Sequence, residues 1–429
     1  MPNLEVLNSR LNLLQEDVEA LLATLKKLTE DVQSFGGPQV RSHIDLGHKA
    51  VDQITAITRL LGTMALTSSA ADWTNYNEIR DNVAQINQEV LEIVQGLAIH
   101  RGKEDEEFCW IVRRFLEGIF GDFLGLTVFT ARDLNVPTLA RLTRVRFPVK
   151  SIWTLPFAAH QFANLKIKDT AELVEFAKEV AASEVRTLLS GVSDLARRKA
   201  EAKAHSRWTQ MMSDGLAVYF TGPCYAGSAI LMRLSPAAME PDDDWQASEL
   251  DRAFVIVEML RQMDVKLEGQ ETPYTGFINW LEKQWNEMLA AAGSEGLSDE
   301  RRKDLEEFVR DLMKVADKNL SSGKYPTTII PYIEGSWSTA QRWSQEWPGQ
   351  VEKGVPLTLP KDISSSSNVR DAFNAGWLCR SKIDSDARNV MAIGVAVLEL
   401  CGQIVQGFYQ PQAQPAQTHG PAGTRAVGQ

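Results

Sequence analysis

The chain has 429 residues, of which 44% are hydrophobic and 24% are charged, a composition typical of soluble globular proteins. Its formal net charge of −11 repels phosphate backbones and argues against a general nucleic-acid binder. The four cysteines form no CxxC pair, which excludes the usual zinc-knuckle spacings and a disulfide framework. The first residues do not have the pattern of a signal peptide, and we expect a cytoplasmic protein that does not enter a membrane.

The first predicted helix follows a heptad seam of leucine and valine. Apolar residues recur from Leu4 to Val32 in steps of three and four, and a Gly-Gly-Pro sequence then ends the helix. Two further helical patterns, at 40–62 and 73–99, can pack against it. Together they predict an antiparallel helical bundle or coiled-coil arm over residues 1–102. The alternative use of the Leu4–Val32 seam is pairing between two chains in a homodimer.

Residues 103–409 predict a large helical body with at most a few short strands, so the expected fold class is mostly α. An aromatic-rich apolar stretch at 108–130 predicts a buried helix, and RVRFPV at 144–149 a short strand. The last twenty residues, 410–429, are rich in Pro, Gln, Ala and Gly and predict a disordered tail. Further helices are expected within 170–234 and at 246–264, 273–292, 298–320 and 368–408.

One uncharged stretch, residues 215–232, is just long enough to cross a bilayer. Gly222 and Pro223 interrupt its middle, so we interpret it as a buried core helix that is broken or kinked at Pro223. The tryptophans of GSWSTAQRWSQEW, residues 335–347, predict a helix packed against the body. The isolated cysteines are expected to be small core residues.

The stretch SIWTLPFAAHQFANLKI, residues 151–167, places His160 on an apolar helix. Zincin metallopeptidases hold zinc with two histidines at i and i+4 of a helix, and a glutamate beside the first acts as general base. The stretch resembles the segment that leads into this H-E-x-x-H helix in bacterial proteins of the gluzincin type. Here Gln161 stands in place of the base, and Asn164 in place of the second histidine.

A second segment, RWTQMMSDGLAVYFTGPCYAGSAILMRL at residues 207–234, resembles the helix that carries the third, acidic ligand of such proteins. In that helix the ligand is followed four residues later by aspartate and then by an apolar run with Gly-Pro. Asp214 and the Gly-Pro pair are retained here, whereas Gln210 replaces the ligand. The resemblance covers residues 150–235, and the letters that make the motif diagnostic are the ones replaced.

The resemblance implies a vestigial site made of His160, Gln161, Asn164, Gln210 and Asp214. Glutamine cannot take up a proton at neutral pH, and neutral amide oxygens are poor zinc ligands. We therefore expect a catalytically inactive, zincin-like pseudoenzyme without a metal or other cofactor. Such a protein would act as a scaffold, regulator or accessory subunit by binding a protein partner.

Two alternatives remain open at this point. A histidine on an apolar helix is also what an ordinary buried histidine looks like, which would make the chain a helical interaction protein without peptidase ancestry. The other alternative is an active metal-dependent hydrolase with unusual ligands, for which His160, His205 and Asp214 are the candidates. The relative placement of segments 160–164 and 210–214 bears directly on this choice.

Overall fold

A computed structural model gives the architecture of the helical body. The predicted bundle over 1–102, its Leu4–Val32 seam and the predicted tail at 410–429 lie outside the described residues, apart from isolated helical positions of the bundle. The described residues are 153–188, 193–236, 246–265, 274–320, 332, 334–361, 363, 368–383 and 387–409, with shorter pieces at 23, 52, 56, 77–80, 111, 114–115, 127–130 and 143–146.

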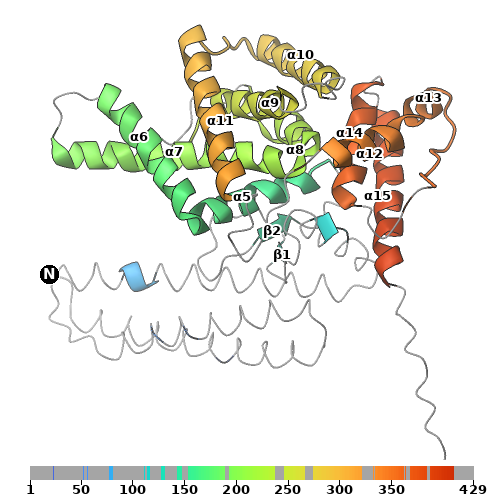
Figure 1. Cartoon of the computed structure of the whole chain (residues 1–429), viewed down its shortest axis with the longest axis horizontal. Helices are drawn as coiled ribbons and strands as arrows, with labels where there is room; N and C mark the ends of the chain where they lie inside the picture. The colour runs from blue at the N-terminus through green and yellow to red at the C-terminus, as the bar shows by residue number, and fades with distance from the viewer. Residues whose placement is uncertain are drawn as a thin grey trace, which may run out of the picture.

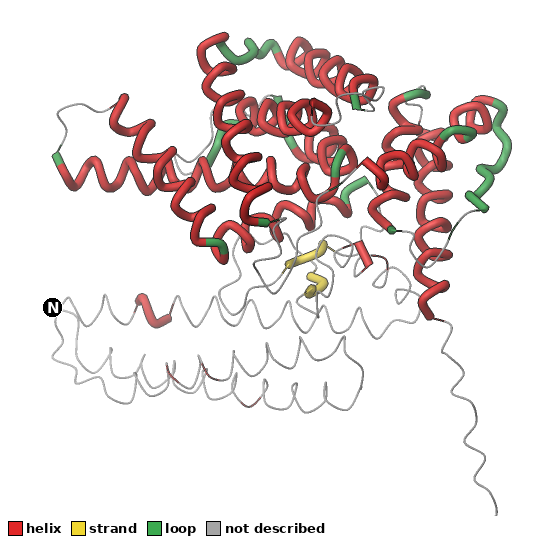
Figure 2. Tube along the Cα trace, in the orientation of Figure 1, coloured by secondary structure: helices red, strands yellow, loops and turns green. Residues whose placement is uncertain are grey.

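The described part of the chain is mostly α, as the sequence predicts (Figures 1 and 2). Its first half contains the 3₁₀ turn η2 (Leu155–Phe157), α5 (Ala158–Asp169), α6 (Ala171–Leu188), α7 (Asp194–Thr221), α8 (Pro223–Ser228) and the π-helical turn η3 (Ala229–Arg233). Its second half contains α9 (Glu249–Val265), α10 (Thr275–Ala292), α11 (Asp299–Asn319), α12 (Glu334–Ser344), α13 (Trp347–Glu352), α14 (Val369–Ser381) and α15 (Ala387–Tyr409).

Two short strands precede the helical body. β1 (Thr127–Thr130) pairs in parallel with β2 (Thr143–Arg146), with Thr127 opposite Thr143. β2 includes the start of the predicted RVRFPV strand, but β1 shows that the helix predicted over 108–130 is wrong at its C-terminal end. The sequence of β1, TVFT, consists of β-branched and aromatic residues, which fit a strand better than a helix.

Helix α7 is the central element of the body. Its N-terminus is capped by Ser193, whose hydroxyl accepts a hydrogen bond from the backbone N–H of Ala196. Its first half is largely exposed or half-buried, whereas every residue from 211 to 221 is buried. Helices α5, α6, α9 and α11 pack around it (Figure 1), so the core of the described body is built on the second half of α7.

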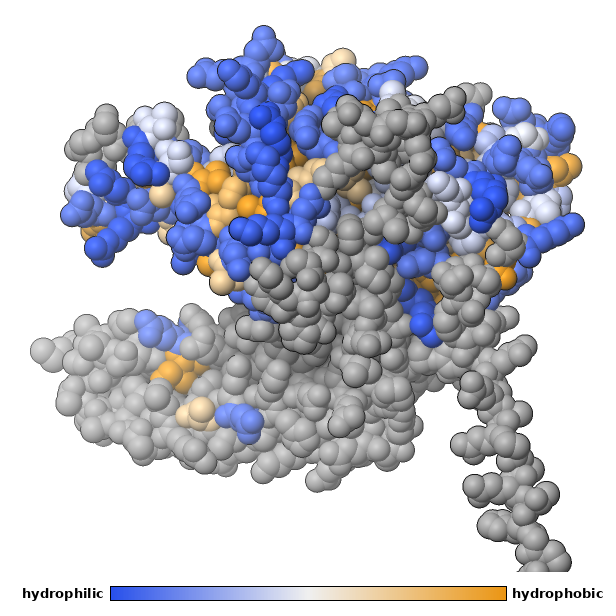
Figure 3. All heavy atoms as spheres, in the orientation of Figure 1, coloured by the Kyte–Doolittle hydropathy of each residue, from blue (hydrophilic) through white to orange (hydrophobic). Residues whose placement is uncertain are grey.

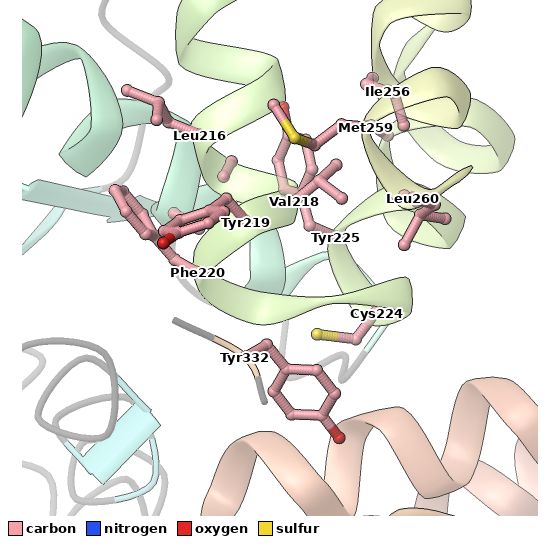
Figure 4. Close-up of a cluster of buried hydrophobic side chains, with 14 of the residues drawn as sticks. Leu216, Val218, Tyr219, Phe220, Cys224, Tyr225, Ile256, Met259, Leu260 and Tyr332 are labelled. Carbon is pink, nitrogen blue, oxygen red and sulfur yellow. The ribbon is translucent and has the colours of Figure 1, made fainter. Parts of the chain in front are cut away.

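The uncharged stretch 215–232 is a buried core segment broken at Gly-Pro, as predicted. α7 ends at Thr221, Gly222 adopts φ 70° and ψ −148°, and Pro223 begins α8. This backbone conformation is open to glycine alone, and proline cannot continue a helix because it has no N–H. Figure 4 shows the side chain of Cys224 next to the ring of Tyr332 at this turn.

The C-terminal part corrects one prediction and confirms another. The single helix expected over 368–408 is two helices, α14 and α15. Trp337, Trp343 and Trp347 are buried, so α12 and α13 do pack their tryptophans against the body. The cysteines that the structure describes, Cys224, Cys379 and Cys401, are buried thiols, as expected for core residues; Cys109 lies outside the described residues.

Helices α11 and α15 differ in hydropathy. Figure 3 shows α11 as a largely hydrophilic column on the visible face, consistent with its many charged residues. Among the described helices, α15 contains one 18-residue window, Arg388–Val405, with mean hydropathy 1.4 and 44% of its residues buried. By length and composition this window could cross a membrane, which a core helix of a soluble protein can also satisfy.

Candidate functional site

Helix α5 carries His160 on its buried face. The preceding turn η2 contains Pro156, which favours the start of a helix, and α5 continues directly from it. The buried residues beside the histidine are mostly alanines, which let α5 approach α7 closely. The His160 side chain is 8% exposed, and its ring therefore lies at the inner surface between the two helices.

His160 and Asp214 meet in the core. Nδ1 of His160 lies 2.7 Å from Oδ1 of Asp214, and the aspartate is fully buried on α7. Because the carboxyl is ionised, as its surroundings below require, Nδ1 carries the proton and donates it to Oδ1. The other ring nitrogen, Nε2, hydrogen-bonds no residue that the structure describes.

Two further side chains complete the hydrogen bonding of Asp214. From α9, Arg252 donates Nε–H to Oδ2 at 2.7 Å and Nη2–H to Oδ1 at 3.2 Å. From α8, the hydroxyl of Tyr225 donates to Oδ1 at 2.5 Å and lies 3.3 Å from Nδ1 of His160. The buried carboxylate is therefore surrounded by donors from three other helices, and its charge is compensated by one guanidinium.

The pKa values of the cluster follow from burial and from this pairing. Burial alone would raise the pKa of Asp214, but the charge of Arg252 and the pairing and hydrogen bonds with Arg252 and His160 lower it far below its ordinary value. Burial lowers the pKa of His160, against the opposing effect of Asp214, and Arg252 adds to the lowering. Burial and the nearby Asp214 raise the pKa of Tyr225. At neutral pH the cluster thus holds an ionised aspartate, a charged arginine, a neutral histidine and a neutral tyrosine.

Asn164 and Gln210 lie one helical turn from this pair. Asn164 follows His160 by four residues on α5, and Gln210 precedes Asp214 by four on α7. Because α5 and α7 run in opposite directions (Figure 1), Asn164 and Gln210 are displaced from the His160–Asp214 pair in the same direction along the interface. Oδ1 of Asn164 is buried without a hydrogen-bond partner.

The other predicted site residues have surroundings of their own. Oε1 of Gln210 accepts a hydrogen bond from the backbone N–H of Ala247 at 3.0 Å, so this amide ties α7 to the segment before α9. Gln161 is partly buried on α5. His205 lies beside Lys178 of α6, which together with burial lowers the pKa of the histidine. In the part of the chain that the structure describes, no three His, Cys, Asp or Glu side chains gather to hold a metal, so His205 does not join His160 and Asp214.

The sequence reasoning missed Arg252 and Tyr225. Arg252 is separated from Asp214 by 38 residues, and nothing in its neighbourhood distinguishes it from a surface arginine. Tyr225 follows the Gly-Pro break by two residues, and a polar aromatic residue in an otherwise apolar segment was the available signal, because a buried tyrosine hydroxyl requires a partner.

The break between α7 and α8 is fixed by two polar side chains of α14. Arg370 donates Nη1–H to the carbonyl oxygen of Phe220 at 2.6 Å. Asn374 donates Nδ2–H to the carbonyl oxygen of Thr221 at 2.9 Å, and its Oδ1 accepts the N–H of Cys224 at 2.8 Å. These bonds satisfy backbone groups that the interrupted helix leaves open, and they hold the start of the helix that carries the tyrosine of the cluster.

Comparison with known proteins adds no assignment. The chain matches no protein-family model, no curated protein and no solved structure. The function of the chain is therefore inferred from the His160–Asp214 cluster and from the segments that carry its residues.

Proposed function

We propose that this chain is a catalytically inactive, metallopeptidase-like protein that acts through contacts with a protein partner. The observation that carries the proposal is the hydrogen bond between Nδ1 of His160 and Asp214, residues that come from the two zincin-like segments. Histidines that bind metals commonly donate their other ring N–H to a carboxylate, which fixes the tautomer and leaves Nε2 for the ion. The His160–Asp214 pair has this arrangement.

The positions of the two amides support the same proposal. In a zincin site the second histidine lies one turn after the first, and the acidic ligand comes from the facing helix. Asn164 lies one turn after His160 on α5, and Gln210 lies one turn before Asp214 on α7. Because the two helices are antiparallel, both residues lie on the same side of the His160–Asp214 pair along the helix axes. A histidine and a glutamate at these two positions would therefore approach the same region as Nε2.

The side chains present argue against peptidase chemistry at this site. Gln161 cannot act as a general base, because an amide takes up no proton near neutral pH. Asn164 and Gln210 offer uncharged oxygens, and that of Gln210 is already bonded to Ala247. Arg252 compensates the charge of Asp214, so the cluster is electrically complete without a cation.

We infer a role as scaffold, regulator or accessory subunit because a protein that retains the frame of an enzyme without its chemistry can still bind. We assign these partner contacts to the heptad seam Leu4–Val32. The same seam could instead pair two copies of the chain or pack within the predicted bundle. A helical interaction protein without peptidase ancestry is the reading that remains if the test below fails.

The test is to restore the metal-site residues at positions 161, 164 and 210 and to measure the zinc bound per chain. The variant Gln161→Glu, Asn164→His, Gln210→Glu is expected to copurify with stoichiometric zinc, measured by mass spectrometry, whereas the unchanged chain contains none. The matched control adds His160→Ala to the same three changes and should lose the zinc. Absence of zinc from a triple variant with native circular dichroism would refute the proposal. Should the triple variant not fold, Asn164→His alone, which gives two histidines at i and i+4, must bind zinc more tightly than the unchanged chain.

A further inference from the structure

Arg380, in the last turn of α14, lies against the rings of two tryptophans. Its guanidinium carbon is 4.9 Å from the ring centroid of Trp153 and 4.9 Å from that of Trp377. The two indoles meet edge to face, with centroids 4.9 Å apart. Such contacts hold the planar guanidinium in one orientation and attract its charge to the ring faces.

This arginine differs from three other shielded arginines of the body, which pair with carboxylates. Arg252 pairs with Asp214, Arg261 pairs with two glutamates, and Arg301 pairs with Asp251 at 2.6 Å. Among the described residues no carboxylate lies at ion-pair distance from Arg380, and its Nε and Nη1 are buried without an acceptor. Burial lowers its pKa, and no neighbouring negative charge opposes this effect.

The adjacent tryptophan has the same deficit. Trp377 is fully buried, and its Nε1–H has no acceptor either. The ring reaches this depth because Gly227 of α8 has no side chain: a Cβ there would lie 2.5 Å from Cε3 of Trp377. One turn of α14 thus presents three N–H groups and one positive charge, and the described residues supply no acceptor for any of them.

A partly buried cation without an anion is costly, and cation–π attraction offsets only part of the desolvation. Native proteins rarely leave several buried hydrogen-bond donors of one helical turn without acceptors. Such a group of donors is a candidate for binding an acceptor from a ligand. Arg380 is only partly buried as a residue, so part of its side chain remains accessible to a ligand.

We propose that Arg380, held against Trp153 and Trp377, binds an oxyanion group of a ligand, either a carboxylate or a phosphate. The guanidinium fork donates charge-assisted hydrogen bonds to either group. The indole rings hold the fork in place before the ligand arrives, which reduces the entropy lost on binding. The proposal does not rest on the zincin-like cluster, although Trp153 lies in the segment 151–167 that also carries His160, and Trp377 packs on α8, which also carries Tyr225.

The experiment titrates the full chain with sodium acetate and, separately, with sodium phosphate, at an ionic strength kept constant with sodium chloride. Tryptophan emission and the melting temperature are recorded, because the two rings that contact Arg380 report on its surroundings. We expect a saturable change in emission and a higher melting temperature with at least one of the two anions. A response to acetate alone identifies a carboxylate site, a response to phosphate alone a phosphate site, and a response to both the shared oxyanion chemistry.

Variants separate the site from general salt effects. Arg380→Gln should raise the dissociation constant at least about tenfold, since a charge-assisted hydrogen bond is lost. Lys382→Gln, which removes an exposed cation two residues away, should leave it unchanged. If Arg380→Gln does not fold, Trp153→Phe must reduce the emission response to the anion. The proposal is overturned if the unchanged chain shows no saturable response to either anion, or if the arginine variant responds as the unchanged chain does.

Discussion

Both carboxylate oxygens of Asp214 accept hydrogen bonds from Arg252, and the aspartate has no exposed surface. The pair joins α7 to α9 at the centre of the body, while His160 and Tyr225 occupy the remaining acceptor sites of the carboxylate. The cluster is therefore one unit in which removal of any charge leaves another buried charge without compensation.

The first prediction concerns this compensation. Asp214→Asn should lower the free energy of unfolding by about 3–5 kcal/mol, because it leaves the guanidinium of Arg252 buried without an anion. Denaturant unfolding monitored by circular dichroism measures the change. The control is Asp311→Asn, which breaks an exposed pair with Lys314 and should cost less than about 1 kcal/mol. Equal effects of the two substitutions would show that Asp214 is not buried in an ion pair.

The second prediction is a dependence of stability on pH. The pKa of His160 in the folded chain lies below its ordinary value of 6.5, so the unfolded chain binds a proton that the folded chain does not. The free energy of unfolding should therefore be unaffected by this group at high pH and decrease as the pH falls below about 6.5 towards the folded pKa. His160→Asn should remove this part of the decrease.

The comparison for this prediction is His205→Asn. Burial also lowers the pKa of His205, but its side chain is more exposed, so the decrease that it contributes should be smaller. Asp214 acts in the same direction at lower pH: its stabilisation is present above about pH 4 and is lost as the pH falls towards its depressed pKa. A stability profile that rises between pH 7 and pH 5.5 in the unchanged chain would contradict the buried, neutral His160.

The third prediction concerns the polar brace at the helix break. Asn374→Ala leaves the N–H of Cys224 without its acceptor in the core and the carbonyl oxygen of Thr221 with only the weak thiol donor of Cys224, and should cost about 2–4 kcal/mol of unfolding free energy. Asn286→Ala is the matched control, since it makes the same change on an exposed position of α10 and should be neutral or slightly stabilising. Urea midpoints of the two variants, measured side by side, decide the point.

The fourth prediction compares two glycines. Gly222→Ala should destabilise the fold by several kcal/mol, because its φ of 70° with ψ of −148° is strained for alanine and a Cβ would lie 2.4 Å from the Tyr332 ring. Gly276→Ala should stabilise α10 by about 0.5–1 kcal/mol, since nothing lies within 4 Å of the added methyl group. Melting temperatures that shift in the same direction for both variants would contradict the geometry of the break.

The helices of the body could be read from the sequence because apolar spacing and caps agree there. Serine at 298 starts α11 as expected, with its hydroxyl accepting the N–H of Arg301, and the Gly-Pro pair breaks the core segment where proline requires it. The division between α14 and α15 could not be read, because apolar residues continue on both sides of the interruption. β1 was missed because its four residues follow a long apolar run that also suits a helix.

The candidate site could be predicted in part. His160 and Asp214 could be named as candidates from the sequence, since each lies in a segment whose residue order resembles a zincin motif. Arg252 could not be identified, because the pairing of a buried arginine with a carboxylate depends on how α7 and α9 pack, and this packing is encoded by apolar residues common to any core helix. The partner of Gln210 escaped prediction for the same reason: it is a backbone group of a distant segment.

The most direct test of the central claim locates the ion itself. Crystals of the variant Gln161→Glu, Asn164→His, Gln210→Glu, grown with zinc, would be measured on both sides of the zinc absorption edge. The account predicts one anomalous peak between α5 and α7, about 2.0–2.1 Å from Nε2 of His160. A folded variant without a peak at that nitrogen, or with its zinc bound elsewhere, would contradict a former metal site between these helices.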